Sequence, residues 1–174
     1  YSFDLTITPL PAIKSATLQD LPRNLPREVA VELVKESERA FDARMDSIRA
    51  GVYTDAAKLV RQYLDTTCRV GQWSLDQAND NPPTKRPPVS STVIPNMVSA
   101  ATMLEAFNIG DDRGMEAHAR AIHALAARAT RDQMATNPAV CLPLAKAAAR
   151  VWASLSGEPE PDAPTTPAPI APVS

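Results

Sequence analysis

The sequence predicts an all-α protein of about five helices, arranged as a bundle of two helical hairpin-like groups. Apolar residues recur at three- and four-residue spacing through most of the chain, which is the period of helices that bury one face. Ten of the 17 prolines lie instead in two segments, four in residues 79–91 and six after Gly157. The 174 residues therefore divide into an extended N-terminal arm (1–23), a helical domain (24–157) with a Pro-rich loop (79–91), and a Pro-rich acidic tail (158–174).

The arm begins with an alternating pattern in which Phe3, Leu5 and Ile7 are separated by polar residues. This period is typical of a half-buried strand, and Pro9 and Pro11 then end it. The rest of the chain shows no second convincing strand pattern to pair with it. The arm is expected either to lie over the protein's own helices or to add to a sheet edge supplied by another chain.

Two helices are predicted next, the first from the capping residue Asn24 to Gly51 and the second from Thr54 to about Val70, where Gly71 follows. The short connection between them predicts an antiparallel hairpin. Charged residues cover the opposite face of the first helix and are expected to be solvated. Its apolar residues at helical spacing are Val29, Leu33, Val34, Ala40, Phe41, Met45 and Ile48.

The segment 79–91 carries two Pro-Pro pairs around Lys85 and Arg86. Each proline restricts itself and the residue before it, so the segment is not expected to be helical. It is interpreted either as a plain linker or as a stiff polyproline-like loop that a partner grips through Lys85 and Arg86.

The second half predicts three further helices, over 95–108, 113–135 and 137–157. Asp111 and Asp112 are candidate caps for the middle one, and Gly157 is expected to end the last. Pro143 lies inside the last pattern and predicts a kink or a short turn before the main helix resumes near Leu144.

The helix over 113–135 carries four arginines that fall within a stripe of about 80°. These residues are Arg113, Arg120, Arg128 and Arg131. Guanidinium groups on one face can follow a phosphate backbone or an acidic protein surface. The alternatives are a solvated helix face and pairing with acids of the first helix. No aromatic residue falls on this stripe, which argues against stacking on single-stranded bases.

Catalytic groups are sparse in the sequence. The common nucleophile, metal and phosphate-binding motifs are missing, and the two histidines, His118 and His123, point about 140° apart on one helix. His118 is interpreted as a partly buried histidine with a hydrogen-bond partner. We therefore assign no catalytic residue, metal ligand or cofactor, and Cys68 and Cys141 are expected to be reduced.

The tail combines three acids with six prolines and no base. Such a composition does not bury enough apolar surface to fold alone. It is interpreted either as a solubilising tail or as a segment that docks on a neighbouring subunit. In the second case Ile170 and Val173 would be its anchors.

The net charge of −2 is too small for bulk attraction to polyanions, and no stretch is long and apolar enough to span a membrane. Arms at both ends of a helical body favour a non-enzymatic structural subunit of a larger assembly. Its partners would be other protein subunits in a homo- or hetero-oligomer, with nucleic acid as a further candidate. The alternatives are a small adaptor or regulator that grips one partner, and an enzyme whose site the sequence does not reveal; the compartment stays unassigned.

Overall fold

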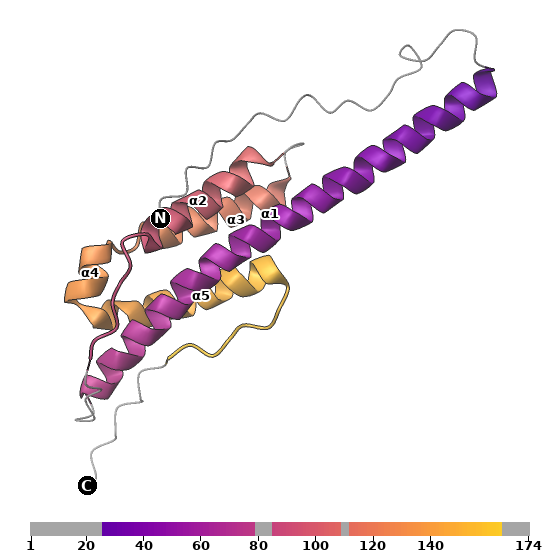
Figure 1. The fold of residues 1–174 in the computed structure, drawn as a ribbon. Coiled ribbons are helices and arrows are strands. Elements are labelled where there is room, and N and C mark those ends of the chain that lie inside the picture. The colour runs from indigo at the N-terminus through magenta and orange to yellow at the C-terminus, as the bar shows by residue number, and fades with distance from the viewer. Residues whose placement is uncertain (1–25, 79–84, 109–111, 165–174) are drawn as a thin grey trace. The chain divides into compact units, whose positions relative to one another are not determined.

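The structure is a computed structural model that describes residues 26–78, 85–108 and 112–164. These residues form the helices α1 (Arg27–Ala78), α2 (Val93–Ala106), α3 (Arg113–Ala126), α4 (Arg131–Thr136) and α5 (Cys141–Ser156), and a short 3₁₀ turn (Pro138–Val140) (Figure 1). The predicted all-α class is confirmed, and the described segments contain no strand. The chain forms two compact units, residues 1–50 and residues 51–174, which are described separately below.

The predicted hairpin between the first two helices is wrong, because α1 runs without interruption from Arg27 to Ala78. Gly51 and Gly71 both lie inside this helix. A glycine inside a helix costs only about 1 kcal/mol relative to alanine. After Gly51 the sequence at once supplies apolar residues at helical spacing, Val52, Ala56 and Val60, and all three are buried. Packing therefore outweighs the local preference for a turn.

The core of the second unit lies between the later part of α1 and the helices α2, α3 and α5. Gln62 of α1 accepts a hydrogen bond from Asn96 of α2, and Tyr53 of α1 lies against His118 of α3. Both ends of α5 also meet α1. The largest fully buried side chains include Tyr63, Met97, Leu104, Met115, Ile122, Leu125 and Met134.

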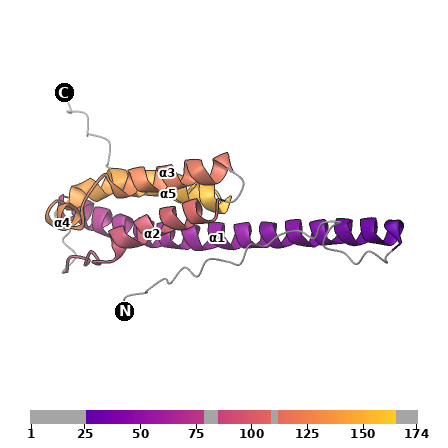
Figure 2. The same cartoon turned by 90° about the horizontal axis from the view of Figure 1, so that it is seen from above.

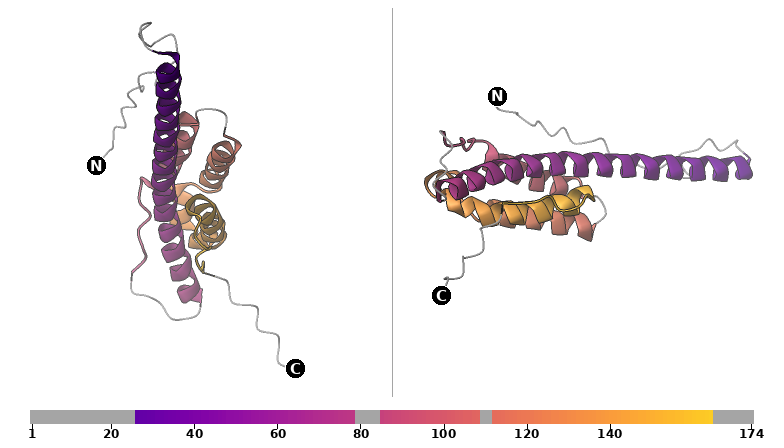
Figure 3. Two further views of the ribbon diagram at one scale, coloured as in Figure 1. Left: turned by 90° about the vertical axis from the view of Figure 1, so that its right-hand side faces the viewer. Right: turned by 90° about the horizontal axis from the view of Figure 1, so that it is seen from below.

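Within this unit α3 and α5 form one layer, and the later part of α1 forms the other with α2 (Figure 2). Gly71 lies beside Leu142 near the start of α5, and Arg61 lies over Trp152 near its end, so α1 and α5 are antiparallel. Figure 3 shows the same pairing of α5 with α1 from below.

The ends of α3 and α5 follow the predicted signals. The Asp112 carboxylate accepts hydrogen bonds from the backbone N–H groups of Gly114 and Met115, which caps α3. Gly157 ends α5 in a left-handed conformation with φ of 71°. Pro143 does not kink α5, because it lies in the first turn, where a proline's missing N–H is tolerated. The interruption lies earlier, at the 3₁₀ turn.

Candidate functional site

The four arginines predicted to share one helix face do not share a helix. Arg113 and Arg120 lie on α3 and are exposed, and Arg120 pairs with Glu116 at 3.7 Å. The helix ends at Ala126, so Arg128 lies in the following turn and Arg131 is the first residue of α4. The predicted continuous helix over 113–135 is therefore wrong.

A capping box explains this break. The Thr130 hydroxyl accepts a hydrogen bond from the Gln133 N–H, and the Gln133 side chain accepts one from the Thr130 N–H. Together they start a new helix at Arg131. The T-x-x-Q spacing at 130–133 was the sequence signal that could have located the break.

Arg131 serves inside its own molecule. Its Nε donates to the Val89 carbonyl at 3.2 Å, and its Nη1 lies 3.3 Å from the Asp132 carboxylate. Val89 is itself buried, so this bond fastens the end of the Pro-rich loop to the helical body.

The two loop residues predicted to meet a partner differ in their surroundings. Lys85 is exposed, whereas the Arg86 guanidinium lies 5.3 Å from the centre of the Trp73 ring in a cation–π contact. Arg86 thus already has an aromatic partner within the protein. A partner role for Lys85 and Arg86 stays a prediction.

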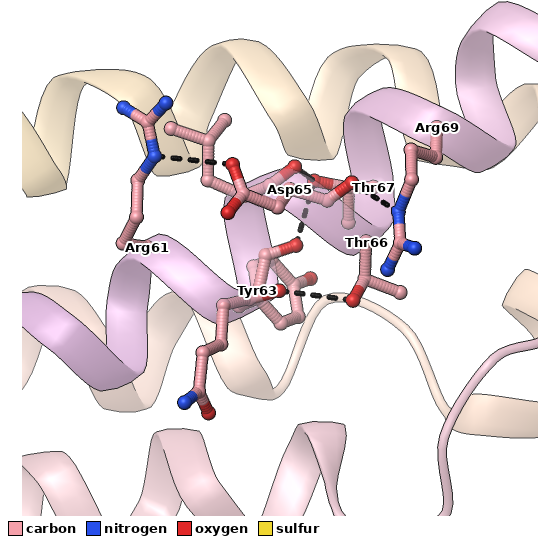
Figure 4. A network of polar contacts seen from close by, with 8 residues as sticks. Arg61, Tyr63, Asp65, Thr66, Thr67 and Arg69 are labelled. Atoms are coloured by element: carbon pink, nitrogen blue, oxygen red, sulfur yellow. Dashed lines mark hydrogen bonds and ion pairs between the residues drawn. The ribbon is translucent and has the colours of Figure 1, made fainter.

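A polar cluster lies along residues 61–69 of α1 (Figure 4). Arg61 Nε lies 3.0 Å from the Asp65 carboxylate, and the same guanidinium lies 4.9 Å from the centre of the Trp152 ring. Arg69 donates to the Asp65 carbonyl. The hydroxyl groups of Thr66 and Thr67 donate hydrogen bonds to backbone carbonyls of the preceding turn. These contacts stabilise the helix and its packing on α5.

His118 has the hydrogen-bond partners that its pattern predicted. Its Nε2 lies 2.8 Å from Ser154 Oγ, and its Nδ1 lies 3.5 Å from the Tyr53 hydroxyl. The row of Tyr, His and Ser resembles an activated nucleophile in outline. Ser154, however, lies in the last turn of α5, where the backbone N–H groups are already bonded and the open groups are carbonyls. Carbonyl oxygens would repel the oxyanion that such a nucleophile generates. The hydrogen bonds among Tyr53, His118 and Ser154 instead join α1, α3 and α5.

Two buried ionisable groups lie in the core. Burial raises the pKa of the Tyr63 phenol well above its usual value, Cys141 adds to this effect, and Arg128 opposes it. Burial also raises the pKa of the Cys141 thiol to about 11, with Arg86 opposing. Both cysteines are free in the structure, and burial raises the pKa of Cys68 as well. Protonated thiols are poor nucleophiles, so neither cysteine is an activated one.

The part of α1 in the N-terminal unit presents an apolar surface that no described contact explains. None of the residues from Arg27 to Ala50 is buried, although the stretch carries a regular apolar pattern. Val34, Phe41, Met45 and Ile48 are half-buried. Val29 and Leu33 are 45% and 41% exposed and are two of the three exposed large apolar side chains in the part of the chain that the structure describes.

The arm residues Phe3, Leu5 and Ile7 and the tail residues Ile170 and Val173 lie outside the described residues. The first part of the tail is described, and there the Glu160 carboxylate lies 3.7 Å from Arg150 Nε of α5.

Residues 26–78, 85–108 and 112–164 contain no group of three or more side chains able to hold a metal ion. No helix formed by these residues is long and apolar enough to cross a membrane. No protein family matches the chain, and neither a curated protein nor a solved structure is similar to it.

Proposed function

We propose that the protein is a non-enzymatic structural subunit of a larger assembly, and that residues 27–50 of α1 form its contact with a neighbouring subunit. The observation that carries the proposal is the combination of a regular apolar pattern with the lack of a single buried residue over this stretch. Helices in proteins owe most of their stability to packing of an apolar face. A neighbouring subunit would supply that packing here.

The apolar side chains of residues 27–50 cover more than one face of the helix, which favours contact with more than one neighbouring surface. At 100° per residue, Val29, Leu33 and Ala40 lie about 110° around the helix from Val34 and Phe41. The apolar surface of this part of α1 therefore extends beyond the face that carries Val34 and Phe41. Exposed apolar patches are typical of protein interfaces.

The other candidate functions have weaker support. A partner gripping the loop 79–91 would compete with the contact of Arg86 on Trp73 and the bond from Arg131 to Val89. The proposal of nucleic-acid binding depended on four arginines on one helix face, and these arginines do not share a helix. The arginine surface now consists of Arg113 and Arg120, and contact of this pair with nucleic acid or an acidic partner stays a secondary proposal.

Sedimentation velocity of the full chain over a range of concentrations tests the proposal. We expect a mass above 18.7 kDa that grows with concentration. Phe41→Glu places a charge on the apolar face and should return the protein to 18.7 kDa. Val98→Glu is the control, because Val98 is an exposed apolar side chain on α2, outside residues 27–50. A mass of 18.7 kDa at every concentration, or association that ignores Phe41→Glu, would contradict the proposal.

A further inference from the structure

We infer that the neighbour of residues 27–50 is a second copy of the same chain, paired antiparallel along this part of α1. The inference rests on the proposed function and adds the identity of the partner and its orientation. Three observations carry it: the spacing of the apolar residues, the signs of the flanking charges, and the position of one acidic residue in the seam.

The apolar residues follow a seven-residue repeat. In such a repeat the first and fourth positions face a partner helix. Here these positions are Val31, Val34, Glu38, Phe41, Met45 and Ile48. All but Glu38 are apolar and half-buried, and on a straight helix all six fall within an arc of about 100°. The spacing is that of a two-stranded seam about 27 Å long.

The charges beside this seam alternate in sign. The fifth positions of successive repeats are Glu28, Lys35, Asp42 and Arg49. In an antiparallel pair with Val34 opposite Met45, each fifth position faces a fifth position of the other copy. Glu28 then meets Arg49, Lys35 meets Asp42, and every pair combines opposite charges.

The parallel arrangement lacks this complementarity. There the seventh position of one helix approaches the fifth position of the next repeat on the other helix. Arg44 would approach Arg49 of the other copy, Ser37 would approach Asp42, and no pair of opposite charges would form. Like charges across a seam disfavour that pairing.

Glu38 fits the antiparallel register as well. It faces Phe41 of the second copy, on the side of the seam where Arg44 of that copy also lies. The Arg44 guanidinium of the second copy can then pair with the Glu38 carboxylate, which is the one charged group in the seam. A single charged residue in a seam favours one register over the others, at some cost in stability. Arg49 keeps its neighbour Asp46, 3.4 Å away in the same helix, and the Arg49 side chain is 40% exposed.

Disulfide trapping tests the orientation. Val31→Cys and Ile48→Cys are made separately in the full chain carrying Cys68→Ser, while Cys141 stays because it is buried and protonated. After oxidation with oxidised glutathione, a mixture of the two variants should give a disulfide between position 31 of one copy and position 48 of the other. Each variant alone should give little, because like positions lie about 26 Å apart along an antiparallel pair.

Charge exchange tests the pairing without cysteines. Lys35→Glu should weaken self-association about tenfold, since it creates two like-charge contacts in each dimer. The double variant Lys35→Glu/Asp42→Lys should restore it, because both pairs are rebuilt with exchanged signs. Glu36→Lys is the control, because position 36 points away from the seam.

The outcomes separate this inference from the proposed function. An associated chain that links position 31 to position 31, or that the double variant fails to restore, overturns the antiparallel pairing and leaves the assembly role standing. A chain that stays at 18.7 kDa overturns both. Restoration by the double variant together with the 31-to-48 disulfide supports the antiparallel pairing.

Discussion

Gly71 of α1 packs directly against Leu142 of α5. A Cβ atom placed on Gly71 would lie 2.9 Å from Leu142 Cδ2 and 3.4 Å from the Leu142 backbone nitrogen. The glycine thus does not end a helix, as its sequence position suggests, but lets two helices approach closely. Gly51, by contrast, has open space where a side chain would begin.

This contrast predicts opposite effects at the two glycines. Gly71→Val should lower the free energy of unfolding by about 1–3 kcal/mol, because its methyl groups overpack the contact with α5. Gly51→Ala should raise it by about 0.5–1 kcal/mol, because alanine favours helix and meets nothing. Urea unfolding followed by circular dichroism measures both. Equal effects at the two positions would contradict the assigned packing.

The Tyr63 hydroxyl is buried, and no described residue offers it a hydrogen-bond partner. Tyr63→Phe should therefore leave stability unchanged or raise it by up to about 1 kcal/mol, since it removes a desolvated polar group. Thermal unfolding of the two proteins gives the comparison. A loss of more than 1 kcal/mol would show that the hydroxyl is bonded after all.

The raised pKa of Cys141 predicts a loss of stability in alkali. The unfolded thiol ionises near pH 9, whereas the folded one holds its proton to about pH 11. The folded state binds the proton more tightly, so its stabilising effect is complete below pH 9 and is lost as the pH rises to 11. The expected slope in this window is up to about 1.4 kcal/mol per pH unit.

Cys141→Ala isolates this effect, because the difference in unfolding free energy between the two proteins should change only above pH 9. Alkylation with iodoacetamide at pH 8 gives an independent check. Cys68, which is only half-buried, should react first, and Cys141 should react only after unfolding. Rapid labelling of Cys141 in the folded protein would be incompatible with its burial.

The break after α3 divides the predicted four-arginine face between α3, the following turn and α4. Of the four arginines, only Arg113 and Arg120 share a helix face. Duplex DNA held by this pair alone should show a slope of about −2 in a plot of the logarithm of affinity against the logarithm of salt concentration. Four arginines on one stripe would give about −4. Titrations at several salt concentrations, with Arg113→Glu/Arg120→Glu as the comparison, distinguish the two.

Periodicity predicted where most helices lie because it reports burial directly. Asp112 and Gly157 also stand at the ends of helices as their chemistry suggests. The wrong helix boundaries lie where a single residue suggested an end that the packing overrides, or where a capping pair interrupts a periodic stretch. Gly51 and Gly71 suggested ends of helices, although the penalty for a helical glycine is small beside the packing of the residues that follow. The capping pair Thr130 and Gln133 was missed and divided a predicted helix in two.

The polar contacts were harder to anticipate. His118 was expected to find a partner, but Tyr53 and Ser154 lie 65 and 36 residues away in the chain. Only the packing of α1, α3 and α5 brings them together. The same holds for Arg86 on Trp73 and Arg131 on Val89. Residue type predicted that these side chains would need partners, whereas the fold decided which ones.

Hydrogen exchange of the backbone amides in residues 27–50, measured on the full chain at low and high concentration, tests the central claim most directly. A helix without a buried residue should exchange quickly while it is alone and slowly once a second subunit covers it. The account predicts that protection of this stretch rises with concentration, while protection of residues 113–126 stays constant. Equal exchange of residues 27–50 at both concentrations, in protein that stays at 18.7 kDa, would contradict it.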